Sequence, residues 1–200
     1  MLEENQVHEY WERRANKHGA RTVGFVNKPL DFQSEICEQR AKFIFPHCPR
    51  FLRTLDFGCG TGNFTNYFGS YLGVDISESL LDFAKTAYPG KRFVLLKQPI
   101  PSEKEIFLFK PELFFSVTVL QHNSDDLVRK IFKSMVQIGQ DMMFSIYENC
   151  QVMAKHVKAR DPEDYLTLLD DYFKVLTSCS FSHFTHGEKH ALTIAKVEPL

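Results

Sequence analysis

The segment LDFGCGTGNF, residues 55–64, places one acidic residue before three closely spaced glycines. Asp56 ends a short apolar run, and Gly58, Gly60 and Gly62 follow it. Glycine is needed where the backbone turns sharply at positive φ and where a ligand lies directly against main-chain atoms. A carboxylate at Asp56 would repel a pyrophosphate but attract an ammonium group. The segment therefore predicts a strand-to-helix turn that binds a zwitterionic ligand.

The glycine spacing differs from that of a dinucleotide site. The pattern G-x-G-x-x-G, begun at Gly58, requires glycine at position 63, where this chain has Asn63. An NAD-dependent dehydrogenase is therefore a weaker interpretation than a site for a zwitterionic ligand. Selective binding of a nicotinamide dinucleotide would support the dehydrogenase instead.

A second acidic residue, Asp75, ends the next apolar run in GVDIS. Ligands of open α/β sheets bind at the carboxyl edge of the strands, where this side chain is expected. A carboxylate there can accept hydrogen bonds from both hydroxyls of a ribose, and the neighbouring Ile76 could cover one face of an adenine.

A parallel sheet would bring these residues to one edge. Runs rich in Val, Leu, Ile and Phe alternate with segments of helical spacing or length, which is typical of an α/β fold. Strands are predicted at 53–57, 71–75, 92–96, 112–120 and 141–147, and helices at 61–68, 77–88, 102–109 and 124–138. A helix that starts at Asp161 and Pro162, then a hairpin of 173–184 and 190–197, would complete the sheet with an antiparallel edge.

Two amphipathic patterns precede the sheet, at residues 5–18 and about 30–45. They predict a helical cap over residues 1–50, followed by a catalytic core over 51–200, in one domain of 1–200. Tyr10 and Trp11 on the first helix could present an aromatic face to a bound cation and acceptor. The alternative is that Trp11 only anchors the cap to the core.

The stretches LDFGCGTGNF, GVDIS and LFFSVTVLQH together resemble the Rossmann-like, class I S-adenosylmethionine-dependent methyltransferases, in particular their small-molecule type. The resemblance covers about 53–147. It implies a three-layer sandwich with a mostly parallel seven-stranded sheet and a C-terminal antiparallel hairpin. It also implies S-adenosylmethionine as cofactor, S-adenosylhomocysteine as product and no metal.

The resemblance also assigns roles near the glycine turn. The loop of Gly58, Gly60 and Gly62 would pass along the aminoacyl part of the cofactor, with Cys59 a small side chain packed within it. Asp56 would help hold the amino group, directly or through water. Asp75 would bind the ribose hydroxyls.

Further roles fall on residues after the third and fourth predicted strands. The main-chain carbonyl of Thr118 would meet the methionyl amine, and His122 stands where such enzymes often carry a histidine. The chain departs from the family in LLKQPIP, where an acidic residue is common; Gln98 could accept the adenine amino group through its amide oxygen.

Methyl transfer is an in-line displacement, so positioning of the acceptor is the main task. A general base is needed only where the acceptor loses a proton. His122 is the first candidate, because an unperturbed histidine pKa of about 6.5 suits neutral pH. Tyr147 and Glu148 are weaker candidates at the same sheet edge.

The segment ENCQVMAKHVKARD is the predicted acceptor region. It contains Lys155, His156, Lys158 and Arg160, whose charges could receive a carboxylate or phosphate of the acceptor. Arg160 is the preferred clamp, because a guanidinium binds a planar carboxylate with two hydrogen bonds. A solvated basic face is the alternative.

Composition narrows the possible partners. The 24 basic and 25 acidic residues give no excess positive charge for a nucleic acid or membrane surface, and no apolar stretch has the length of a membrane span. Five cysteines without a C-x-x-C pair indicate free thiols, and His47–Cys48 is a poor metal pair.

We expect a cytoplasmic monomer or homodimer that binds a small-molecule acceptor. The alternative function is a non-catalytic S-adenosylmethionine-binding module that acts as a sensor or partner subunit.

Overall fold

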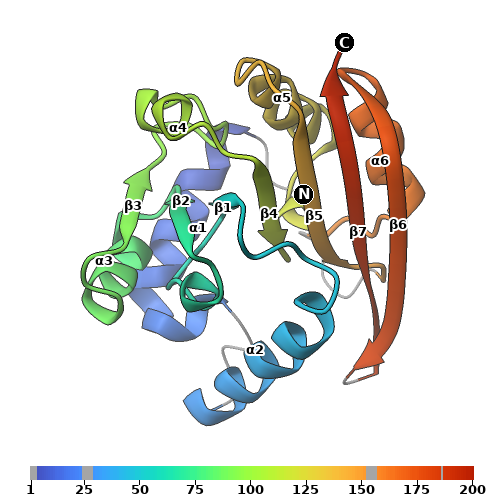
Figure 1. The fold of residues 1–200 in the computed structure, drawn as a ribbon. Helices are drawn as coiled ribbons and strands as arrows, with labels where there is room; N and C mark the ends of the chain where they lie inside the picture. The colour runs from blue at the N-terminus through green and yellow to red at the C-terminus, as the bar shows by residue number, and fades with distance from the viewer. Residues whose placement is uncertain (1–3, 24–28, 152–156, 186) are drawn as a thin grey trace.

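The computed structural model describes residues 4–23, 29–151, 157–185 and 187–200, and a seven-stranded sheet forms its centre (Figure 1). The strand order is β3-β2-β1-β4-β5-β7-β6. The strands are β1 (Arg53–Phe57), β2 (Ser70–Asp75), β3 (Arg92–Leu95), β4 (Leu113–Val117), β5 (Met142–Asn149), β6 (Phe173–Thr185) and β7 (Glu188–Pro199). The first five strands are parallel to one another, whereas β7 is antiparallel to both β5 and β6.

The sheet reverses its strand order beside β1, because β2 lies on one side of that strand and β4 on the other. Such a reversal opens a crevice at the carboxyl ends of the strands, where ligands of α/β proteins bind. The Rossmann-like fold predicted from the sequence, with its antiparallel C-terminal hairpin, is confirmed.

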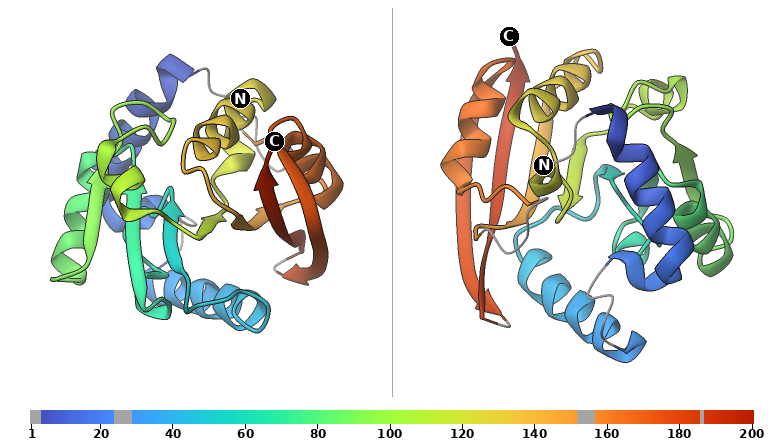
Figure 2. Two further views of the ribbon diagram at one scale, coloured as in Figure 1. Left: turned by 45° about the horizontal axis from the view of Figure 1, so that its top comes forward. Right: turned by 180° about the vertical axis from the view of Figure 1, so that it is seen from behind.

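Helices cover both faces of the sheet (Figure 2). One face carries α5 and α6, and the opposite face carries α2. The helices are α1 (Glu4–His18), α2 (Leu30–Ile44), α3 (Glu78–Ala87), α4 (Lys104–Phe109), α5 (Asp125–Val136) and α6 (Pro162–Asp170), with shorter 3-10 helices η1 (Gly19–Val23), η2 (Thr65–Tyr67) and η3 (Leu120–His122).

Adjacent residues of β4 show why its sequence lacks polar alternation. Phe114 packs against Phe132 and Phe144 under α5, with ring centroids 6.2 and 5.1 Å away. Phe115 points to the other face, where it contacts Phe68 at 5.0 Å. Both faces of the strand are therefore apolar and buried, as in parallel sheets covered by helices on each side.

The helix predicted over residues 61–68 is wrong. The structure has a turn followed by the short 3-10 helix η2. Gly62 has a φ of +80°, which is incompatible with a helical start there. Phe64 and Phe68 both contact Phe115, at 5.6 and 5.0 Å, so tertiary packing of two rings replaces a regular helix.

Helix α1 bridges α3 and α5 beside the carboxyl edge of the sheet. Ser77 Oγ donates a hydrogen bond of 2.7 Å to Glu12, and Ser79 also donates to this carboxylate. At the other end of α1, Glu4 forms a 2.5 Å ion pair with Lys130. These contacts hold one half of the predicted cap in place.

No helix among the described residues is long and apolar enough to cross a membrane. The same residues contain no group of three or more His, Cys, Asp or Glu side chains that could hold a metal ion.

Candidate active site

The glycine turn after β1 uses backbone conformations that favour glycine. Gly58, Gly60 and Gly62 have φ angles of +71°, +54° and +80°. A Cβ atom added to Gly58 would lie 2.5 Å from Cγ2 of Val119 in the loop after β4. The turn is thus packed against that loop, while Gly58 also lines a cavity at the carboxyl edge of the sheet.

Asp75 at the end of β2 joins the glycine turn to α3. Its Oδ2 accepts the Gly60 N–H at 2.8 Å, and its Oδ1 accepts the Ser77 N–H at 2.9 Å. Burial raises the pKa of Asp75, although these backbone hydrogen bonds act in the opposite direction. The carboxylate is therefore fixed in the wall of the cavity.

Asp56 lies at the end of β1 in the same wall. Burial raises its pKa to about 7, while the hydrogen bond from Tyr71 Oη, 2.8 Å from Oδ2, lowers it. Asp75 adds a like charge nearby. Two buried carboxylates at one end of a cavity favour a cationic group as ligand, because its charge would offset the cost of ionising them.

Thr118 follows β4 and has a φ of +56°, which is rare for a β-branched residue. Its N–H donates to the Tyr147 carbonyl at 2.7 Å, which holds this conformation. Such strained residues concentrate at functional sites, and Thr118 lines the cavity.

Glu148 of β5 holds the loop that follows Thr118. Its carboxylate accepts N–H groups from Val119 at 3.1 Å, Leu120 at 2.8 Å and Gln121 at 3.4 Å. Burial raises the pKa of Glu148 to about 8, against the lowering effect of these bonds. Its position gives it a positioning role for the loop.

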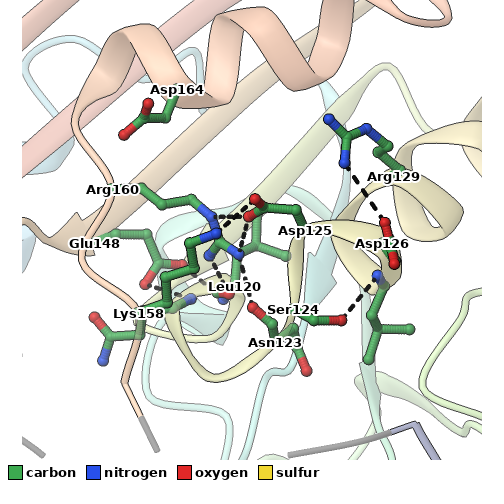
Figure 3. Close-up of polar contacts among 12 residues, drawn as sticks. Leu120, Asn123, Ser124, Asp125, Asp126, Arg129, Glu148, Lys158, Arg160 and Asp164 are labelled. Carbon is green, nitrogen blue, oxygen red and sulfur yellow. Dashed lines mark hydrogen bonds and ion pairs between the residues drawn. The ribbon is translucent and has the colours of Figure 1, made fainter. Parts of the chain in front are cut away.

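Arg160 lies beneath the same loop and is 3% exposed (Figure 3). Its guanidinium donates to the Leu120 and Asn123 carbonyls at 2.9 and 2.7 Å, and to Asp125 Oδ1 through both Nε and Nη2. Lys158 pairs with the same Asp125. This geometry differs from the predicted anion clamp, because the chain itself occupies the donors. The predicted Lys155 and His156 lie outside the described residues.

Trp11 and His122 meet in the cavity wall, with ring centroids 5.1 Å apart at an interplanar angle of 72°. Val7, Trp11 and Arg14, spaced four and three residues apart, form the face of α1 that lines the cavity. Tyr10 packs edge-on against Trp11 at 5.2 Å and is not among the described lining residues.

Tyr147, the second candidate base, is fully buried in β5. Its Oη lies 2.9 Å from His183 Nε2, and its ring stacks on His190 at 5.3 Å. Burial raises the pKa of Tyr147 to about 12, which disfavours proton abstraction at neutral pH. The residue supports side chains of the wall and is not among the described lining residues.

The loop after β3 presents apolar residues to the cavity. Leu96 and Pro99 line it together with Ile76, whereas Gln98 between them is exposed and absent from the described lining. Glu103 accepts the Lys97 N–H at 2.9 Å and shapes this turn. The structure therefore does not bring Gln98 to the predicted adenine contact.

Sequence reasoning missed a polar group at the other end of the cavity. Asn149 Nδ2 donates to Glu188 Oε2 at 2.6 Å, and His190 Nε2 lies 3.4 Å from the same oxygen. Arg40 of α2 also lines this region. No local sequence motif identifies these residues as part of a site. The only sequence indication is weak: Cys37 and Arg40 are three residues apart, which places both on one face of α2.

The two ends belong to one cavity of about 340 Å³. This volume lies within the range of small-molecule sites. Asp56, Asp75 and the glycine turn form its acidic end, and His122, Asn149 and His190 line the remainder.

Comparison with known proteins shows what the central part of the chain is similar to. Residues 55–141 match a family model described as a methyltransferase domain. No curated protein matches the chain.

Solved structures share the fold over nearly the whole chain. A methyltransferase from Thermotoga maritima, described as a possible histamine N-methyltransferase, has 13% identity and a TM-score of 0.65 over 96% of this chain and 99% of its own. One from Anabaena variabilis has 16% identity and a TM-score of 0.64 over 97% and 95%.

Phosphoethanolamine N-methyltransferase 1 of Haemonchus contortus, solved with phosphoethanolamine and S-adenosylhomocysteine, has 16% identity and a TM-score of 0.67 over 100% of this chain and 50% of its own. Residues 55–141 therefore resemble a methyltransferase domain, and the chain as a whole shares the fold of these S-adenosylmethionine-dependent methyltransferases.

Proposed function

We propose that this chain transfers a methyl group from S-adenosylmethionine to a small-molecule acceptor bound in the same cavity. The observation that carries the proposal is the continuity of this cavity, which joins the acidic end at Asp56 and Asp75 to a second polar wall at Asn149 and His190. A cavity of about 340 Å³ suits small molecules better than a polymer.

The acidic end fits the cofactor. Asp75 would accept the ribose hydroxyls, and Asp56 with the Thr118 carbonyl would hold the ammonium group. Ile76 and Leu96 supply apolar surface for the adenine. The glycine turn admits the aminoacyl chain because no Cβ atom stands in its way. When bound, the cofactor supplies a methyl group activated by a sulfonium.

Arg14 is the candidate partner for the carboxylate of the cofactor. It lines the cavity on α1, and no described residue accepts a hydrogen bond from its buried Nε. Its guanidinium carbon lies 5.9 Å from the Trp11 ring centroid, which orients the cation on the aromatic face. A carboxylate would complete this site.

The remaining wall positions the acceptor. His122 lies beside Trp11 at the end of η3, in the loop after β4, and lines the cavity. From this place it would accept a proton from an acceptor that must lose one. The edge-on contact with Trp11 would orient the His122 ring toward an acceptor held in line with the methyl group.

Two structural neighbours suggest the first acceptors to test. One is described as a possible histamine N-methyltransferase, and the other is a phosphoethanolamine N-methyltransferase. The acceptor panel therefore contains histamine and phosphoethanolamine. It also contains small carboxylic acids and small phosphate-bearing acids.

The test is transfer of a labelled methyl group from S-adenosylmethionine to this acceptor panel. We expect a labelled product with one acceptor class. His122→Ala should lower kcat by about 100-fold where the acceptor loses a proton. His8→Ala, an exposed histidine on α1, is the matched control.

Binding of S-adenosylhomocysteine without transfer to any acceptor would contradict the proposal and favour a non-catalytic binding module. Full activity of His122→Ala would remove only its role as a base.

A further inference from the structure

The second polar wall of the cavity contains a cation without an ionic partner in the described parts of the chain. Arg40 of α2 lines the cavity, and no described residue accepts a hydrogen bond from its buried Nε. No described carboxylate forms an ion pair with it. A partly buried guanidinium is costly unless a counter-charge compensates it.

Aromatic side chains hold this guanidinium instead of an acid. Its central carbon lies 5.9 Å from the Tyr147 ring centroid, and a hydrogen bond links Arg40 to the Tyr147 side chain. Tyr147 is fixed in turn by His183, whose ring stacks on Phe43 at 3.9 Å. Arg40 is thus preorganised by α2, β5 and β6.

The described acid of this wall, Glu188, has other polar partners. Glu188 receives Asn149 Nδ2 at 2.6 Å and lies 3.4 Å from His190 Nε2. His190 stacks on the same Tyr147 that supports Arg40, so the two side chains flank one ring. The wall therefore contains a guanidinium without a described ionic partner and a carboxylate with a hydrogen-bond partner of its own.

We propose that Arg40 forms a subsite for the anionic group of the methyl acceptor, a carboxylate or a phosphate. This inference rests on the proposed function and names its substrate class. A guanidinium offers paired N–H donors that match either anion, and its aromatic support leaves no internal acid in competition. Arg40 takes the role that the sequence had suggested for Arg160.

The test uses inorganic phosphate and acetate as probes of the protein saturated with S-adenosylhomocysteine. Trp11, the one tryptophan of the chain, lines the cavity and reports binding by its fluorescence at constant ionic strength. We expect at least one probe to bind wild type and its affinity to fall about tenfold or more in Arg40→Gln, as for the loss of a charge-assisted hydrogen bond.

Two further variants make the test specific. Arg40→Met keeps an apolar stem against Tyr147 and should lose affinity for the anion to the same extent. Arg50→Gln changes an exposed arginine outside the described lining and should bind the probe as wild type does. Binding of S-adenosylhomocysteine shows which variants are folded.

The possible failures are distinguishable. If wild type does not bind S-adenosylhomocysteine, the proposed function fails. If it binds S-adenosylhomocysteine but neither anion, or if a folded Arg40 variant keeps the wild-type anion affinity, the Arg40 subsite is overturned while the cofactor site stands.

Discussion

At Gly58 the glycine turn packs tightly against the loop after β4. Gly58→Ala would force a Cβ atom to within 2.5 Å of Val119 and add strain at a φ of +71°. We expect the free energy of unfolding to fall by about 2–4 kcal/mol, from strain and overpacking together. Urea unfolding measures this change.

Gly139→Ala is the matched control for that clash. Gly139 has a similar φ of +68°, but no described atom lies within 4 Å of an added Cβ. Its cost should be backbone strain alone, about 1 kcal/mol. If both variants lose the same free energy of unfolding, the Val119 side chain moves aside for the added Cβ atom and the turn is not tightly packed.

Asp56 should couple stability and cofactor affinity to pH in opposite directions. Its pKa of about 7 in the folded protein exceeds its ordinary value of 3.8, so the folded state binds the proton more tightly. The contribution of Asp56 to stability therefore falls as the pH rises between these two values. Relative to wild type, Asp56→Asn should gain stability as the pH rises, and urea unfolding across this range measures it.

The ionised form of Asp56 is the form that binds an ammonium group. Wild-type affinity for S-adenosylhomocysteine should therefore increase as the pH rises through about 7, and Asp56→Asn should lose most of this dependence. Asp82→Asn, an exposed carboxylate on α3, serves as control. A wild-type stability and affinity that do not change with pH would contradict a buried, titrating Asp56.

Arg160 should matter for stability because the loop depends on it. Arg160→Ala removes the hydrogen bonds to two loop carbonyls and leaves Asp125 with Lys158 alone. We expect a loss of about 3 kcal/mol. Arg129→Ala breaks exposed ion pairs and should cost less than about 1 kcal/mol. A stable Arg160→Ala protein with weakened acceptor binding would restore the anion-clamp hypothesis.

At the scale of the elements, α1 closes the cavity through its contact with the start of α3. Burial tends to raise the pKa of Glu12, but hydrogen bonds from Ser79 and Ser77 lower it overall, so the ionised carboxylate is the form that holds α3. Glu12→Ala should loosen α1, with a loss of about 1 kcal/mol comparable to a lost helix cap.

Hydrogen exchange of the α1 amides tests this contact. We expect faster exchange in Glu12→Ala and weaker binding of S-adenosylhomocysteine, because Trp11 and Arg14 lie on the same helix. Glu9→Ala, an exposed acid on α1, should leave both unchanged. Unchanged exchange in Glu12→Ala would mean that packing alone holds α1.

Apolar runs and helical spacing predicted most elements, and the helix caps seen in the structure agree with several of the predicted boundaries. Ser77 and Ser124 cap α3 and α5 by accepting N–H groups, and Gly19 ends α1 at a φ of +59°. The segment 61–68 failed because its aromatic residues serve a tertiary cluster, which helical spacing alone cannot reveal.

At the scale of the whole molecule, the acidic end of the cavity could be predicted and the acceptor end could not. Asp56 and Asp75 each stand at the end of a parallel strand, so the fold places them together. Arg40 and His190 meet at Tyr147 because α2 and the long β6–β7 hairpin both reach the carboxyl edge (Figure 1). The contact of both side chains with Tyr147 depends on how segments far apart in the sequence pack together, which local sequence patterns do not reveal. The cytoplasmic location and the oligomeric state stay predictions.

Asp75 and the glycine turn are proposed to bind the methyl-donor cofactor. The most direct measurement is isothermal titration calorimetry of S-adenosylhomocysteine and, in parallel, NAD with wild type, Asp75→Ala and the exposed control Asp82→Ala. We expect S-adenosylhomocysteine alone to bind wild type and the control, and an affinity at least about tenfold weaker in Asp75→Ala, as for the loss of a charged hydrogen-bond acceptor. Absence of binding to wild type, or equal affinity in Asp75→Ala, would contradict the account.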